Sequence, residues 1–96
     1  MKNRSKTDII ASILGAINRG WATKAKIMYG AYLSYSQLNE YLSFMETTGL
    51  IENKKEFTKK SSHPSYFITT DKGRQFLTIH DQINEIIGTM QIRQDI

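Results

Sequence analysis

The sequence predicts a mainly α-helical α+β fold with three short helices, a two-stranded hairpin and a long C-terminal helix. Three observations carry this prediction. Apolar residues recur at helical spacing in the first half of the chain, a capping-box pattern begins at Ser34, and a heptad pattern follows Asp71. We therefore expect a globular part over residues 1–70 and an extended helix over residues 71–96.

Length and composition exclude several classes of function. The 96 residues, 40% of them hydrophobic, suffice for one small core. With no cysteine and only two histidines, the chain lacks a disulfide framework, a thiolate nucleophile and the ligands of a typical zinc site. No Gly-rich phosphate loop or metal-ligand spacing occurs, so we expect no enzyme, no metal and no cofactor. No apolar stretch approaches the ~20 residues of a membrane span, so we expect a cytoplasmic protein that does not enter membranes.

Positive charge is concentrated in the first part of the chain. Residues 1–70 hold ten lysines and arginines against five carboxylates, a net charge of +5. Residues 71–96 hold three against four, a net charge of −1. A basic globular part is compatible with a polyanionic partner, and the last segment must do something else.

The first two helices are predicted from their caps. Ser5 can cap a helix that runs to about Gly20, and Thr23 can cap a shorter one that ends near Gly30. Their expected apolar members are Ile9, Ile10, Ile13, Leu14 and Ile17 in the first, and Ala25, Ile27, Met28 and Tyr29 in the second. The aromatic residues Trp21, Tyr29, Tyr32 and Phe44 are expected to pack in the core and at hinges.

The third helix carries the clearest local signal. The Ser34 hydroxyl can accept a backbone N–H while the Gln37 amide reaches back, and Gly49 suits a left-handed C-terminal position. The expected buried stripe is Leu38, Tyr41, Leu42 and Met45. Residues 50–52 and 66–69 then read as two strands, joined by a lysine-rich tip.

The last helix, from Thr70 or Asp71 to about Arg93, has an unusual apolar period. Its apolar positions alternate between spacings of four and three residues, which is a heptad seam. The preceding domain is too small to cover so long a helix, so we expect a partner on it. The predicted interface residues are Phe76, Ile79, His80, Ile83, Ile86, Ile87 and Met90. His80 is either a tolerated polar residue at the seam edge or a pH-sensitive element.

This order of elements, with the runs Ile27-Met28-Tyr29, Leu33-Ser34-Tyr35-Ser36-Gln37-Leu38 and Ile68-Thr69-Thr70-Asp71-Lys72-Gly73, resembles the small winged helix-turn-helix DNA-binding proteins of archaea and their viruses. The resemblance implies a winged-helix domain over residues 1–70 and a dimerisation helix over residues 71–96. It also implies an antiparallel coiled coil of the C-terminal helices, a homodimer and double-stranded DNA as ligand. The expected place in the cell is the nucleoid.

Within such a domain, a helix with short polar side chains outward is expected to enter the major groove. The predicted recognition residues are Tyr35, Ser36, Gln37, Asn39, Glu40 and Ser43. Predicted phosphate contacts come from the wing, from the second helix and from the start of the chain: Arg4, Lys6, Lys24, Lys26, Lys54, Lys55, Lys59 and Lys60. We expect the outward side of residues 35–43 and the hairpin to form one continuous cationic surface.

Two functions remain open at this point. The first is double-stranded DNA binding by a homodimer, as a transcriptional regulator or as an architectural protein of the chromosome. The alternative is a protein-interaction module that uses the winged helix as a scaffold.

Overall fold

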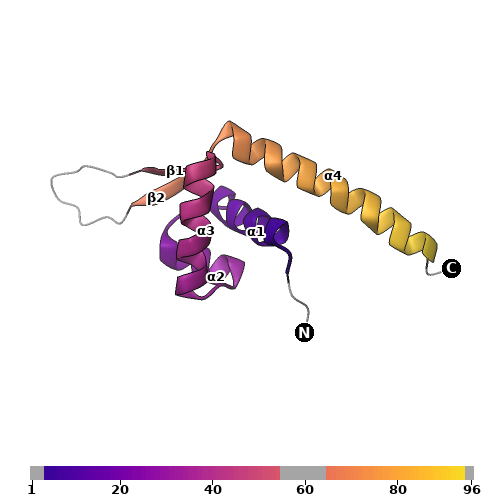
Figure 1. Ribbon diagram of the computed structural model, residues 1–96, viewed down its shortest axis with the longest axis horizontal. Helices are drawn as coiled ribbons and strands as arrows, with labels where there is room; N and C mark the ends of the chain where they lie inside the picture. The colour runs from indigo at the N-terminus through magenta and orange to yellow at the C-terminus, as the bar shows by residue number, and fades with distance from the viewer. Residues whose placement is uncertain (1–3, 55–64, 95–96) are drawn as a thin grey trace.

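The computed structural model describes residues 4–54 and 65–94, with side chains up to residue 88. Within these residues, helices and strands follow in the order α1, α2, α3, β1, β2, α4 (Figure 1). Their bounds are α1 Lys6–Asn18, α2 Lys24–Ala31, α3 Tyr35–Thr48, β1 Ile51–Lys54, β2 Tyr66–Thr69 and α4 Asp71–Gln94. The predicted winged-helix fold of the chain is confirmed.

The predicted helix caps are present. The Ser5 hydroxyl accepts a hydrogen bond from the backbone N–H of Asp8 at 3.1 Å. Ser34 and Gln37 form the full capping box, and Gly49 ends α3 in the left-handed conformation with φ 83°. α1 ends slightly earlier than expected, at Asn18, because the following residues fold back onto its last carbonyls. Local sequence therefore sets where the helices start and stop.

A buried core joins the three short helices to the hairpin. Its buried members are Ile10, Ile13, Leu14, Ile17, Ile27, Ala31, Leu33, Leu38, Leu42, Met45, Leu50, Ile51 and Phe67. The aromatic ring of Phe67 is the largest fully buried side chain and brings β2 into this core. The backbone N–H of Phe67 also donates to the carbonyl of Ala22 at 2.9 Å. The hairpin is thus fixed to the loop between α1 and α2.

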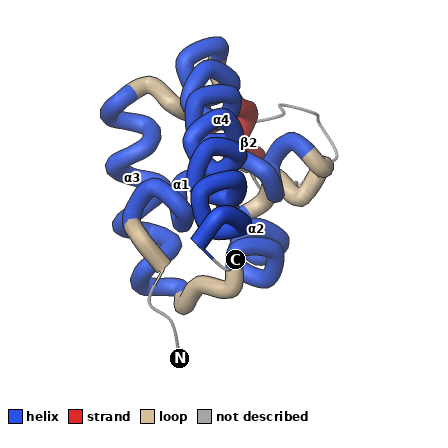
Figure 2. The backbone as a smooth tube through the Cα atoms, turned by 90° about the vertical axis from the view of Figure 1, so that its right-hand side faces the viewer, coloured by secondary structure: helices blue, strands red, loops and turns tan. Residues whose placement is uncertain are grey.

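The two strands pair antiparallel, with Ile51 opposite Thr69 and Lys54 opposite Tyr66. α4 begins directly after β2, and its first turn lies against Leu50, the residue before β1. A Cβ at Gly73 would lie 2.3 Å from the carbonyl oxygen of Leu50, so only glycine fits there. This close approach lets α4 leave the hairpin and run along α1 (Figure 2).

Several aromatic residues lie on the surface. Trp21, Tyr29, Tyr32 and Phe44 are 44% to 85% exposed, so the expectation that they pack in the core was wrong. Ala25 is exposed as well. For Ala25 and Tyr29 the physical reason is that α2 is short, and its buried positions are Ile27 and Ala31.

α4 extends well past the rest of the chain (Figure 1). At 1.5 Å per residue its 24 residues span about 36 Å. Phe76 and Leu77, near its start, pack partly buried against the core. Farther along, Ile79, Ile83, Ile86 and Ile87 are exposed. From Ile79 to Ile87, α4 therefore presents apolar side chains that the described part of this chain covers only partly.

Candidate nucleic-acid interface

A shallow depression of about 290 Å³ lies where α2, α3 and the hairpin meet. The first turn of α2 contributes Lys24, α3 contributes polar side chains, and β1 contributes Asn53. The residues that line it are Lys24, Asn39, Leu42, Ser43, Glu46, Thr47, Asn53 and Phe67, which we call the wing groove. The outer side of α3 and the described base of the hairpin thus share one surface.

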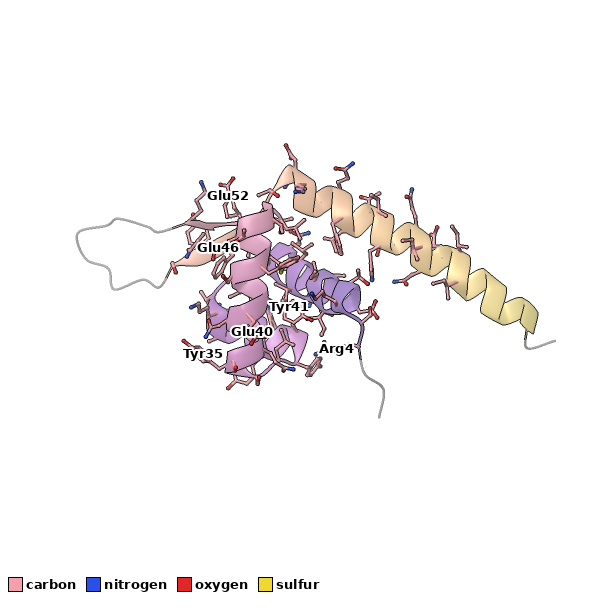
Figure 3. All side chains as sticks on the ribbon, in the orientation of Figure 1. Arg4, Tyr35, Glu40, Tyr41, Glu46 and Glu52 are labelled. Carbon is pink, nitrogen blue, oxygen red and sulfur yellow. The ribbon has the colours of Figure 1, made fainter. Side chains whose placement is uncertain are left out.

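The recognition residues predicted on α3 lie where helix geometry places them. Successive residues turn by 100°, so Ser36, Glu40, Ser43 and Thr47 form the middle of the outward side. All four are exposed, as are Tyr35 and Gln37 at the start of the helix, whereas Asn39 is half-buried at the wing groove. Tyr35 and Glu40 lie toward one end of α3 and Glu46 toward the hairpin (Figure 3).

The charge on this surface differs from the expectation. α3 contains Glu40 and Glu46 and no lysine or arginine, so its outward side is acidic rather than cationic. Among the described residues that line the wing groove, Lys24 of α2 carries the positive charge, and Lys26 is exposed in the same first turn of α2. The Lys54 ammonium at the end of β1 lies 3.2 Å from the Glu52 carboxylate. Lys55, Lys59 and Lys60 lie outside the described residues.

Arg4 has a structural role that its charge did not reveal. Its guanidinium donates from Nη1 to the carbonyl oxygen of Ala31 at 2.6 Å and from Nη2 to that of Tyr32 at 2.9 Å. These carbonyls end α2, and Tyr32 there has a left-handed backbone with φ 56°. Arg4 therefore caps the turn between α2 and α3, a role within the chain that its predicted phosphate contact did not include.

Lys6 also has a contact within the chain. Its ammonium lies 5.4 Å from the centre of the Phe44 ring, a cation–π geometry. Lys6 and Phe44 line a second depression together with Glu40 and Tyr41. This depression lies between α1 and α3, on the flank of α3 away from the wing groove. Lys6 is thus adjacent to the outward side of α3 but not to the hairpin.

The predicted interface residues on α4 divide into two groups. Phe76 packs on the core, and His80 turns toward α1, so both are engaged within the chain. The seam isoleucines Ile79, Ile83 and Ile87 line an apolar groove of about 310 Å³ against the start of α1. Ile86 is exposed beside them. The side chain of Met90 lies outside those described.

The imidazole of His80 links two elements at the edge of that groove. Its Nε2 lies 2.9 Å from Oδ1 of Asp8, its Nδ1 lies 3.4 Å from Nδ2 of Asn84, and its ring stacks on Phe76. The hydrogen bond from His80 and that from Ser5 lower the pKa of the Asp8 carboxyl below its usual 3.8. His80 is therefore more than a tolerated polar residue in the seam.

Sequence reasoning missed three residues of the wing groove: Glu46, Thr47 and Asn53. For two of them a signal existed. Glu46 and Thr47 follow Ser43 by three and four residues, the spacing of one helix face. Asn53 had no such signal, because its place depends on how the hairpin packs beside α3.

Other kinds of site find no support in the described residues. Within residues 4–54 and 65–94, His, Asp and Glu side chains form no group of three that could hold a metal ion. In the same ranges, no helix combines the length and apolarity that crossing a membrane requires.

Comparisons with known proteins agree with the fold. The chain resembles the crystal structure of Sso10a-2, a DNA-binding protein from Sulfolobus solfataricus, with a TM-score of 0.78 and 19% identity, over 96% of this chain and 90% of that one. It also resembles MepR of S. aureus in complex with DNA, with a TM-score of 0.69 and 13% identity, over 96% of this chain and 64% of that one.

A relative in sequence is an uncharacterized protein of Methanocaldococcus jannaschii, 36% identical over 53 residues, which are 55% of each chain. The match thus spans about half the length of that relative. A family model described as winged helix-turn-helix matches residues 3–88, nearly the whole sequence. The chain therefore belongs to the winged helix-turn-helix family.

Proposed function

We propose that this protein binds double-stranded DNA as a homodimer, as a transcriptional regulator or as an architectural protein of the chromosome. The observation that carries the proposal is the wing groove, where Lys24, Asn39, Ser43 and Asn53 lie on one surface. Asn39 and Ser43 offer hydrogen bonds to base edges, and Lys24 offers a charge to phosphate. The solved structures of similar fold support the proposal because Sso10a-2 is a DNA-binding protein and MepR was solved in complex with DNA.

In this proposal α3 enters the major groove and the hairpin lies over the neighbouring backbone. Lys24, Lys26, Lys54, Lys55, Lys59 and Lys60 supply phosphate contacts. Pairing of two α4 helices through Ile79, Ile83, Ile86 and Ile87 makes binding of the second domain intramolecular, which raises the apparent affinity. α4 leaves the domain on the side away from the hairpin, so this pairing keeps the wing groove free (Figure 1).

The test is a mobility-shift titration of a random duplex at several salt concentrations. DNA binding through phosphates predicts that affinity falls steeply with salt, and Lys24→Ala lowers the slope by about one unit. Lys24→Arg keeps the charge and serves as the matched control. If no salt-dependent binding is observed, DNA binding is contradicted and the alternative remains, in which the winged helix is a scaffold for interactions with another protein.

Selection of bound sequences from a random duplex pool separates the two forms of the proposal. Enrichment of one palindromic site indicates a regulator, since a dimer with two-fold symmetry reads two half-sites. Binding without enrichment indicates an architectural protein.

A further inference from the structure

We infer that Glu46 determines which DNA sequences the DNA-binding surface prefers. Its carboxylate lowers the affinity of that surface for every duplex that places no amino group opposite Glu46. The inference rests on the proposed function. It gives a role to a residue whose negative charge would by itself be expected only to weaken DNA binding. Glu46 would accept a hydrogen bond from the exocyclic amino group of cytosine in the major groove.

Glu46 is positioned in the wing groove, on the surface proposed to face DNA. It lies in the C-terminal half of α3 and lines the wing groove with Asn39, Ser43 and Asn53. Figure 3 shows its side chain on the part of α3 nearest the hairpin. In the proposed docking, a duplex seated against α3 and the hairpin lies over this groove, which brings it beside the Glu46 side chain.

The negative charge of Glu46 is not neutralised by an ion pair with the described residues. Its side chain is exposed and forms no ion pair with the described residues, although Lys24 lines the same groove. No cation on α3 offsets it. A carboxylate is negatively charged and therefore repels a phosphate, and because it accepts hydrogen bonds and donates none, it favours a base edge that offers a donor.

Selectivity is a difference between affinities, and a repulsive group can create it. On a random sequence, Glu46 faces base acceptors or phosphate oxygens and lowers affinity. On a sequence that places a cytosine amino group at Glu46, a hydrogen bond replaces this repulsion. Lys24 and the wing lysines can then supply affinity to all sequences without removing the preference.

The experiment compares the wild type, Glu46→Gln and a control, Asp81→Asn, on a random duplex and on the duplex selected by the wild type. Asp81 is exposed on α4, outside the wing groove, and its substitution removes the same single charge. Glu46→Gln is expected to bind the random duplex more tightly and to lower the ratio of selected to random affinity roughly five-fold or more. Asp81→Asn is expected to leave the ratio unchanged.

Equal behaviour of Glu46→Gln and Asp81→Asn would overturn the inference and leave the proposed function standing. A uniform loss of affinity in Glu46→Gln on both duplexes would overturn it too, because that result marks a positioning residue. If the wild type binds duplex DNA without any sequence preference, the inference about Glu46 is overturned as well. Only a wild type that binds no duplex at all removes the proposed function itself. Circular dichroism of each variant checks that the fold is retained.

Discussion

His80 in α4 and Asp8 in α1 form a hydrogen-bonded pair, Nε2 to Oδ1 at 2.9 Å, across 72 positions of the sequence. The pair joins the first turn of the first helix to the C-terminal helix. Phe76, stacked on the His80 ring, continues this contact into the core. The direction in which α4 leaves the domain is thus set by a polar contact in addition to apolar packing.

The first prediction concerns the pH dependence of this pair. The pKa of Asp8 is lowered in the folded protein, chiefly by the hydrogen bond from His80. Its contribution to stability is therefore complete above the ordinary value of 3.8 and is lost as the pH falls through the lowered pKa. Asp8→Asn removes the contribution at all pH values. Thermal unfolding from pH 7 to pH 2 should show the stability gap between wild type and variant closing at acidic pH, and a constant gap would contradict this.

Arg4 provides the second prediction. Because its guanidinium caps the end of α2, Arg4→Ala should destabilise the fold by about 1 kcal/mol, measured by urea unfolding. The salt dependence of DNA binding should stay unchanged, since a capping guanidinium contacts no phosphate. Loss of a phosphate contact would instead lower the slope by about one unit, as expected for Lys24→Ala. The two variants measured side by side separate the roles.

The third prediction compares two glycines of α4. At Gly73 a methyl group would meet the carbonyl oxygen of Leu50 at 2.3 Å and Thr69 Cγ2 at 2.7 Å, so Gly73→Ala should cost about 1–3 kcal/mol. At Gly88 a methyl group meets nothing within 4 Å, so Gly88→Ala should stabilise the helix by up to about 1 kcal/mol. Opposite shifts of the unfolding midpoint are the expected result. A tolerated Gly73→Ala would show that α4 does not start against the Leu50 carbonyl.

The sequence was sufficient wherever structure depends on neighbours in the chain. The capping box of Ser34 and Gln37 and the left-handed Gly49 bound α3 as predicted, because caps act within one helical turn. The predicted stripe of α3 followed from spacing, with Leu38, Leu42 and Met45 buried and Tyr41 half-buried against the core.

Contacts between distant segments were not predictable in this way. The Asp8–His80 pair and the cap by Arg4 depend on how α1 lies beside α4 and against the end of α2. A basic residue near a chain end reads as a phosphate ligand unless its partner is known. Likewise, the spacing of Tyr29 predicts a buried position, whereas its side chain is exposed. Spacing alone does not show which face of a helix lacks a neighbouring element.

The last prediction tests the seam of α4. Ile79, Ile83, Ile86 and Ile87 are 46% to 62% exposed in the single chain, and a second α4 would bury them. Fully burying an isoleucine contributes about 1.5–3 kcal/mol, so covering the exposed half of one contributes roughly half of that, and a symmetric dimer counts each substitution twice. Ile87→Asp should therefore convert a dimer to a monomer in sedimentation while leaving the helical signal of the domain intact.

The matched control is Gln82→Asp, which adds the same charge to an exposed position off the seam and should leave the dimer in place. A dimer that survives Ile87→Asp would place the interface elsewhere. If instead the monomer forms, its affinity for a duplex holding two half-sites should fall much more than its affinity for one half-site, because linkage of two domains raises only the binding of the second. Equal losses on both duplexes would mean that Ile87 acts on the domain itself rather than through pairing.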